Sequence, residues 1–126
     1  MNKFANTVNI LGATWTIEVK KQDEDKILQS AEGYADRTTR RIVICDASGD
    51  TDYGDYDAFQ RKVLRHEIIH AFMFESGLGE CADYGRNGTD HPELMVDWFA
   101  MQFKKLEKAF IDSGAHTSAF QVMKED

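Results

Sequence analysis

Two histidines and a glutamate lie within five consecutive residues near the middle of the chain. The segment reads His66, Glu67, Ile68, Ile69 and His70, which is an HExxH pattern. Residues four apart project from one face of a helix, so both imidazoles could reach one ion while the glutamate faces a water beside it. Imidazole nitrogen and carboxylate oxygen suit zinc, and a catalytic zinc keeps one position open for water. The pattern therefore predicts one Zn²⁺ bound by His66 and His70, with Glu67 as the general base of a hydrolase.

A catalytic zinc needs a third protein ligand, and the second predicted helix offers candidates. Glu93 lies 23 residues after His70, in the first turn of that helix, which the intervening loop could fold back antiparallel to the first. Asp97 follows one turn later, where its carboxylate could accept the N–H of a ligating histidine and fix its tautomer. His91 is the rival third ligand, or a helix cap, or a substrate contact. If it joined Glu93 as a fourth ligand, the site would be closed and structural.

Two long helices are predicted to carry these residues. The first begins at a capping box formed by Asp57 and Gln60 and runs to about Ser76, where Gly77 ends it. The second begins within residues 90–93, because a proline near the first helical position and an acid in the first turn favour a helix start there.

The second helix carries an apolar stripe and ends in a polar tail. The stripe recurs at spacings of four, four, three and four, which predicts a face packed on the core: Met95, Phe99, Phe103, Leu106 and Phe110. Residues 113–126 are polar, so we expect the chain to fray from Ser113 onward.

The N-terminal half predicts a small sheet. Residues 7–11 and 14–19 alternate apolar and polar around a short turn, which is typical of a hairpin. Residues 40–45 predict a third strand. Between them, residues 20–31 predict a short helix and residues 33–36 a turn.

Two polar loops complete the outline. Residues 46–57 are rich in aspartate, but their order is not that of an EF-hand, so a solvated loop is favoured over a calcium site. Residues 78–90 predict an exposed loop before the second helix. The 126 residues should therefore form one α+β domain, with a small antiparallel sheet packed on two long helices.

Composition narrows the class of protein. A formal net charge of -7 disfavours nucleic acid and anionic membranes as partners. The start of the chain lacks the apolar stretch of a secretory signal, and no run approaches the length of a membrane span, so we expect a cytoplasmic protein. Cys45 and Cys81 lie far apart and form no CxxC pair, which favours idle thiols.

The two motifs together resemble those of the gluzincin metallopeptidases, in which HExxH is followed on a later helix by ExxxD. Here the second motif reads Glu93, Leu94, Met95, Val96 and Asp97. More narrowly, the chain is similar to small phage and prophage proteins of the ImmA/IrrE-like or SprT-like kind, through residues 33–36, 41–45, 64–78 and 93–100. The resemblance covers about half of the chain.

That resemblance implies a minimal zincin-like domain that cleaves a peptide or protein substrate, with zinc ligands at His66, His70 and Glu93 and a general base at Glu67. It also implies a strand before the active helix that aligns an extended peptide. We therefore expect substrate to add along the edge formed by residues 41–44.

Several alternatives follow from the same residues. Tyr84, Arg86 and His91 are candidate donors to the oxyanion. We expect no extra DNA-binding or regulatory domain of the kind usual in these proteins, which leaves target recognition open. The competing function is a protein-binding module that keeps the zinc fold but does not cut, which would suit a minimal domain with a short substrate cleft. The acidic charge balance disfavours the nuclease or repair role that the SprT-like similarity suggests. The oligomeric state is not predicted.

Overall fold

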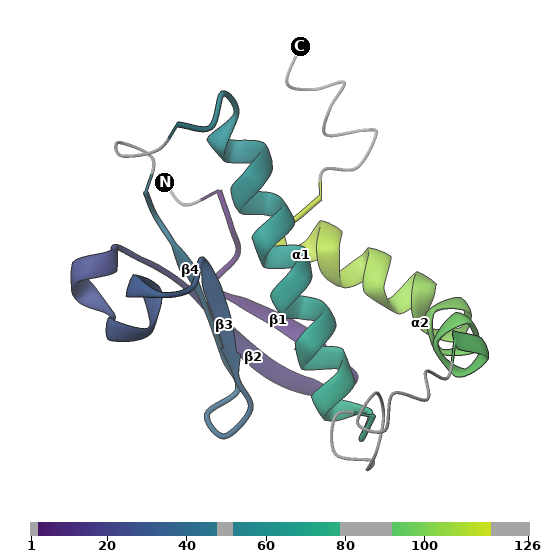
Figure 1. Cartoon of the computed structure of the whole chain (residues 1–126). Coiled ribbons are helices and arrows are strands. Elements are labelled where there is room, and N and C mark those ends of the chain that lie inside the picture. The colour runs from purple at the N-terminus through teal and green to yellow at the C-terminus, as the bar shows by residue number, and fades with distance from the viewer. Residues whose placement is uncertain (1–2, 48–51, 79–91, 117–126) are drawn as a thin grey trace.

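A four-stranded sheet and two long helices make up the computed structural model, which describes residues 3–47, 52–78 and 92–116 (Figure 1). The chain is a small α+β domain, as predicted. In chain order the elements are β1 (Thr7–Ile10), β2 (Ala13–Lys20), the short 3₁₀ helices η1 (Gln22–Glu24) and η2 (Lys26–Gln29), β3 (Gly33–Asp36), β4 (Arg41–Cys45), α1 (Tyr56–Glu75) and α2 (Pro92–Ser113).

The sheet is mixed, with the strand order β1-β2-β4-β3. β1 and β2 pair antiparallel, β2 and β4 pair parallel, and β3 and β4 pair antiparallel. The prediction of a purely antiparallel sheet was therefore wrong for the central pair. The segment with η1 and η2 crosses from β2 to the far edge, and β4 returns beside β2, so the parallel pairing depends on this crossover and not on any local pattern.

The predicted hairpin is confirmed, and its turn explains its register. Leu11 and Gly12 connect β1 to β2, and both have positive φ values, 51° and 96°. Two successive residues with positive φ form a turn whose twist matches that of the flanking strands. Thr7 consequently pairs with Thr16 and Ile10 with Ala13.

Two predictions for the connecting segments were wrong. Residues 33–36 form β3 and not a turn, because their pairing with β4 outweighs the weak strand preference of a Gly- and Asp-containing segment. The turn lies at residues 37–40, where Arg40 has a φ of 52°. Residues 20–31 form the two 3₁₀ helices in place of one helix; Asp25 caps η2 by accepting from the N–H of Ile27.

The first long helix begins two residues before the predicted capping box. Asp55 is the N-cap, and its carboxylate accepts a hydrogen bond of 3.0 Å from the N–H of Ala58. The predicted cap, Asp57, lies inside α1 and pairs with Lys3 and Arg61. The helix ends at Glu75, and Gly77 follows with a φ of 85°, as the glycine signal predicted.

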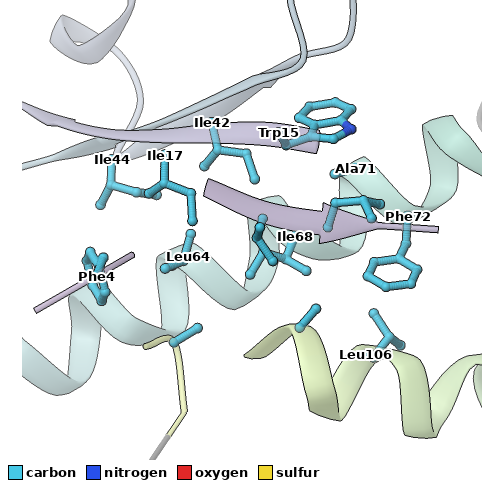
Figure 2. Packing of buried hydrophobic residues seen from close by; sticks show 14 of the residues in the cluster. Phe4, Trp15, Ile17, Ile42, Ile44, Leu64, Ile68, Ala71, Phe72 and Leu106 are labelled. Carbon is cyan, nitrogen blue, oxygen red and sulfur yellow. The ribbon is translucent and has the colours of Figure 1, made fainter. Parts of the chain in front are cut away.

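The core lies between one face of the sheet and the two helices (Figure 2). Buried side chains meet there from β1, β2 and β4 and from both helices. Those labelled in Figure 2 include Trp15, Ile17, Ile42, Ile44, Leu64, Ile68, Ala71, Phe72 and Leu106. The opposite face of the sheet has a smaller cluster formed by Leu28, Val43 and Cys45. None of the described helices is long and apolar enough to cross a membrane.

The apolar stripe predicted for α2 was partly wrong. Leu106 is buried, but Phe99 is 40% exposed and Phe103 is 61% exposed. The buried row contains Trp98 and Ala109, and it meets the predicted stripe at Leu106. Both rows have helical spacing, so only the position of the sheet and of α1 decides which row faces the core.

The chain does not fray at Ser113. Ser113 and Ala115 are fully buried, and the Ser113 carbonyl accepts a 2.9 Å hydrogen bond from the N–H of Ala5. Arg61 donates to the Gly114 carbonyl at 2.6 Å and Arg65 to the Ala115 carbonyl at 2.9 Å. The expectation of a loose tail therefore fails for residues 113–116, and residues 117–126 lie outside the described part of the chain.

Gly33 allows α1 to approach β3 closely. A Cβ at this position would lie 2.9 Å from Cγ1 of Val63, 3.0 Å from the carbonyl oxygen of Val43 and 3.2 Å from Cδ1 of Ile44. We expect Gly33→Ala to lower the free energy of unfolding by about 1 to 3 kcal/mol, because the helix or strand must shift to relieve these contacts. Gly54→Ala is the control, since a Cβ there meets nothing within 4 Å. Equal denaturation midpoints for the two variants would contradict close packing at Gly33.

Glu75 fastens the end of α1 to the sheet. Its carboxylate accepts 2.8 Å from Nε1 of the buried Trp15 and 2.6 Å from Nε of Arg40. The hydrogen bond from Arg40 holds the pKa of Glu75 below its ordinary value, and the hydrogen bond from Trp15 lowers this pKa by a smaller amount. Desolvation acts in the opposite direction but does not cancel the effect.

Because the pKa of Glu75 is lowered in the folded state, the contribution of this residue to the free energy of unfolding depends on pH. It is present above the ordinary value of 4.5 and is lost as the pH falls through the lower pKa of the folded state. Glu75→Gln keeps an acceptor for Trp15 but removes the charge, so we expect a lower Tm at pH 7 and a difference from the natural chain that shrinks below pH 4.5. The exposed Glu107→Gln is the control; a gap that grows in acid would refute this role of Glu75.

Candidate metal centre

The HExxH segment lies on a part of α1 that is half buried. Glu67 and Ile68 face the core, whereas His66 and His70 lie at the exposed border of the helix. Because α1 is capped by Asp55 and packed on the sheet along its length, the two histidines are held one turn apart on a rigid element.

The two imidazoles point toward each other. Nε2 of His70 lies 3.2 Å from Nε2 of His66, and the rings meet edge to face with centroids 4.8 Å apart. Zinc binds imidazole nitrogen at ~2.0 to 2.1 Å. If one ion were bonded to both nitrogens at this separation, the angle between the two bonds would be about 100°, close to the tetrahedral value. The same separation also suits a hydrogen bond between one protonated and one bare nitrogen. The geometry of this pair therefore fits two ligands of one zinc ion.

Glu67 follows His66 on the same helix, and its side chain is mostly withdrawn from water. The residue is 6% exposed, and burial raises the pKa of its carboxyl to about 7. Desolvation disfavours the charged form, and no opposing hydrogen bond to this carboxyl is found within the described residues. A carboxyl that titrates near neutrality can both take up and release a proton at physiological pH.

Burial has the opposite effect on His70. It lowers the pKa of this imidazole, and the charge of His66 lowers it further. The neutral ring is the form that donates an electron pair to a metal. His70 also stacks on Phe74, with centroids 6.2 Å apart and planes inclined by 22°, which fixes one side of the ring.

The strand β3 runs alongside the HExxH turns of α1 (Figure 1). Gly33 approaches Val63 before the motif, and the guanidinium of Arg37 lies 5.7 Å from the ring centroid of Phe74 after it. The motif therefore lies between these two contacts, next to the edge of the sheet.

The edge beside the motif is β3, and the predicted edge at residues 41–44 was wrong. β4 is an interior strand, because it pairs with β2 on one side and β3 on the other. The N–H of Cys45 donates to the carbonyl of Glu32, so these two residues form a hydrogen-bonded pair. Hydrogen-bonded pairs and non-hydrogen-bonded pairs alternate along an antiparallel ladder, and in the latter the main-chain groups point away from the partner strand. In this register the main-chain N–H and C=O groups of Gly33 and Ala35 point away from β4, along the outer edge.

The side chains of the candidate third ligands lie outside what the structure describes. Within residues 3–47, 52–78 and 92–116, no group of three His, Cys, Asp or Glu side chains is arranged to hold a metal. Glu93 and Asp97 are in the first two turns of α2, but their side chains are not among those described, and His91, Tyr84 and Arg86 lie in residues 79–91, outside the described part. In Figure 1 the beginning of α2 is set apart from α1, on the side away from β3.

Sequence reasoning missed two residues near the motif. Phe74 lies one turn after His70 and stacks on it, a relation that helical spacing alone could have indicated. Arg37 reaches the same ring from the turn between β3 and β4, which no local pattern reveals.

Comparisons with protein-family models, with curated proteins and with solved structures find no match for this chain. The functional argument therefore depends on the geometry of His66, Glu67 and His70.

Metal content tests this geometry directly. We expect the purified protein to bind one zinc ion per chain, and His66→Ala or His70→Ala to lose it, because two of the ligands come from this pair. His116→Ala, at an exposed position beyond α2, is the control. Glu93→Gln and His91→Ala compare the two candidate third ligands. Stoichiometric zinc in the double variant of His66 and His70 would exclude the site.

Proposed function

We propose that this protein is a zinc-dependent hydrolase that cleaves a peptide bond in a protein or peptide substrate. The observation that carries the proposal is the 3.2 Å separation of the two Nε2 atoms, in a stretch of α1 that also holds the buried Glu67. One turn of α1 thus carries two imidazole nitrogens close enough to share an ion and a carboxyl whose pKa is raised to about 7 by burial, and these support the proposal.

Each residue of the motif has a distinct role in this proposal. His66 and His70 hold zinc through Nε2, and Glu93, or else His91, supplies the third ligand. Zinc, when bound, polarises the substrate carbonyl and makes water more acidic. Glu67 takes the proton of the attacking water and then gives it to the leaving amine. The raised pKa of Glu67 supports this second transfer, because a more strongly acidic carboxyl would release its proton to solvent.

The position of β3 supports an extended polypeptide as the substrate. The outward main-chain groups of Gly33 and Ala35 can pair with a further strand, and the helix that carries the histidines packs closely on β3 at Gly33. Main-chain hydrogen bonds recognise any extended peptide and would hold it in register with the metal centre. A small ester or amide would use none of these groups.

Glu67→Gln tests the assigned base. We expect this variant to bind zinc as the natural chain does and to lose about 10²- to 10⁴-fold in kcat, because the amide cannot accept a proton. Turnover is measured on a panel of unfolded polypeptides, after zinc has been removed with a chelator and again after zinc has been added back. The exposed Glu107→Gln is the control. Full turnover in Glu67→Gln would exclude Glu67 as the general base. Absence of zinc-dependent cleavage by the natural chain would favour a binding module that does not cut.

A further inference from the structure

Three rings follow one another along one face of α1. His66, His70 and Phe74 are spaced by four residues, so each ring lies one helical turn from the next. His66 and His70 meet edge to face with centroids 4.8 Å apart, and His70 stacks on Phe74 with centroids 6.2 Å apart. The row of rings therefore continues from the histidine pair into the last turn of the helix, which ends at Glu75.

The orientation of the His70 ring decides which of its two nitrogens faces His66. The helix fixes the direction of the Cα–Cβ bond, but the torsion that turns an imidazole about its Cβ–Cγ bond is broad and roughly two-fold. A metal-binding histidine is usually oriented by a hydrogen bond from its other nitrogen to an acceptor. In the part of the chain that the structure describes, the ring of His70 makes a polar contact with Nε2 of His66 alone. The stacking on Phe74 is the described contact that can orient this ring.

The ring of Phe74 is itself held in place. The guanidinium of Arg37 lies over it, 5.7 Å from the centroid, and a cation is attracted to the face of an aromatic ring. The next residue, Glu75, accepts hydrogen bonds of 2.8 Å from Trp15 and 2.6 Å from Arg40. Helix ends ordinarily fray, but these bonds tie the last turn of α1 to β2 and to the turn after β3. Phe74 thus offers the imidazole a fixed surface.

We propose that Phe74 is a positioning residue of the metal centre, because its ring holds the imidazole of His70 with Nε2 turned toward Nε2 of His66. The inference rests on the proposed function for the presence of zinc, and it adds a residue outside the HExxH motif. In this role Phe74 binds neither the ion nor the substrate. Without its ring, the imidazole can turn, and zinc binding must then supply the order that the stacking provides in advance.

Zinc affinity tests this role without any need for cleavage. We expect Phe74→Leu to raise the dissociation constant for zinc, measured by competition with a chelator, by about 3- to 10-fold, the range of one aromatic pair. Phe74→Tyr keeps the ring and should bind zinc as the natural chain does. Phe74 is half buried and borders a surface cavity of about 300 Å³, so its loss does not open the centre of the core. Should Phe74→Leu fail to fold, Phe74→Met fills a similar volume without a ring and is held to the same outcome.

A matched substitution separates this contact from a general loosening of α1. Phe59 is also half buried on α1 and lies before the motif, so Phe59→Leu makes the same change away from the histidines. The Tm of each variant without metal records the effect on stability. The visible absorption of Co²⁺ bound in place of zinc reports the coordination geometry. We expect this spectrum to change in Phe74→Leu and to stay the same in Phe59→Leu and Phe74→Tyr.

Three results would overturn the role of Phe74. They are natural zinc affinity in Phe74→Leu, an equal loss of affinity in Phe59→Leu, and a loss in Phe74→Tyr as large as that in Phe74→Leu. A natural chain that binds no zinc would overturn both this inference and the metal centre.

The same measurements keep this inference distinct from the proposed function. Zinc-dependent cleavage with unchanged zinc affinity in Phe74→Leu would retain the hydrolase and overturn the positioning role. Zinc binding that depends on the ring of Phe74, but without any cleavage, would retain the positioning role and overturn the hydrolase.

Discussion

The close packing of α1 on β3 is the contact on which the candidate site depends. Gly33 lets the helix approach the strand at Val63, and Arg37 meets the helix again at Phe74. Between these contacts α1 turns Glu67 inward and leaves His66 and His70 at the border. A larger residue at position 33 would move the helix off the strand and separate the motif from the sheet edge.

This packing also sets the chemical character of the motif. Removal from water raises the pKa of Glu67 and lowers the pKa of His70, because in each case desolvation disfavours the charged form. The two shifts have opposite directions but one physical origin. They leave a carboxyl able to exchange protons and an imidazole able to bind a metal, within one turn of helix.

The ion pair between Arg40 and Glu75 at the end of α1 follows from the same arrangement. Glu75 at the end of α1 binds Arg40 and Trp15, which ties the helix to the turn after β3 and to β2. The carboxylate of Glu75 is thus shared between a buried indole and a guanidinium from the turn after β3.

Local patterns sufficed for the elements whose signals are short in range. The hairpin, the end of α1 just before Gly77 and the start of α2 at Pro92 were predicted, as was the helical position of the HExxH motif. The cap at Asp55 was missed, because packing decides which of two nearby residues caps a helix. The strand at residues 33–36 was missed, because its strand propensity is weak and packing decides whether it forms. The exposed Phe99 and Phe103 show the same limit: periodicity finds a row of apolar residues, but not which row faces the core.

The sequence by itself determined which side chains can do chemistry and that His66 and His70 share a helix face, since a spacing of four residues fixes this in any α-helix. Only the tertiary structure decided that β4 is interior and that β3 is the edge beside the motif. It also decided that Glu67 is buried and that Arg37 stands next to Phe74. Strand order, burial and contacts between distant residues arise from how whole elements pack, and no local spacing contains that information.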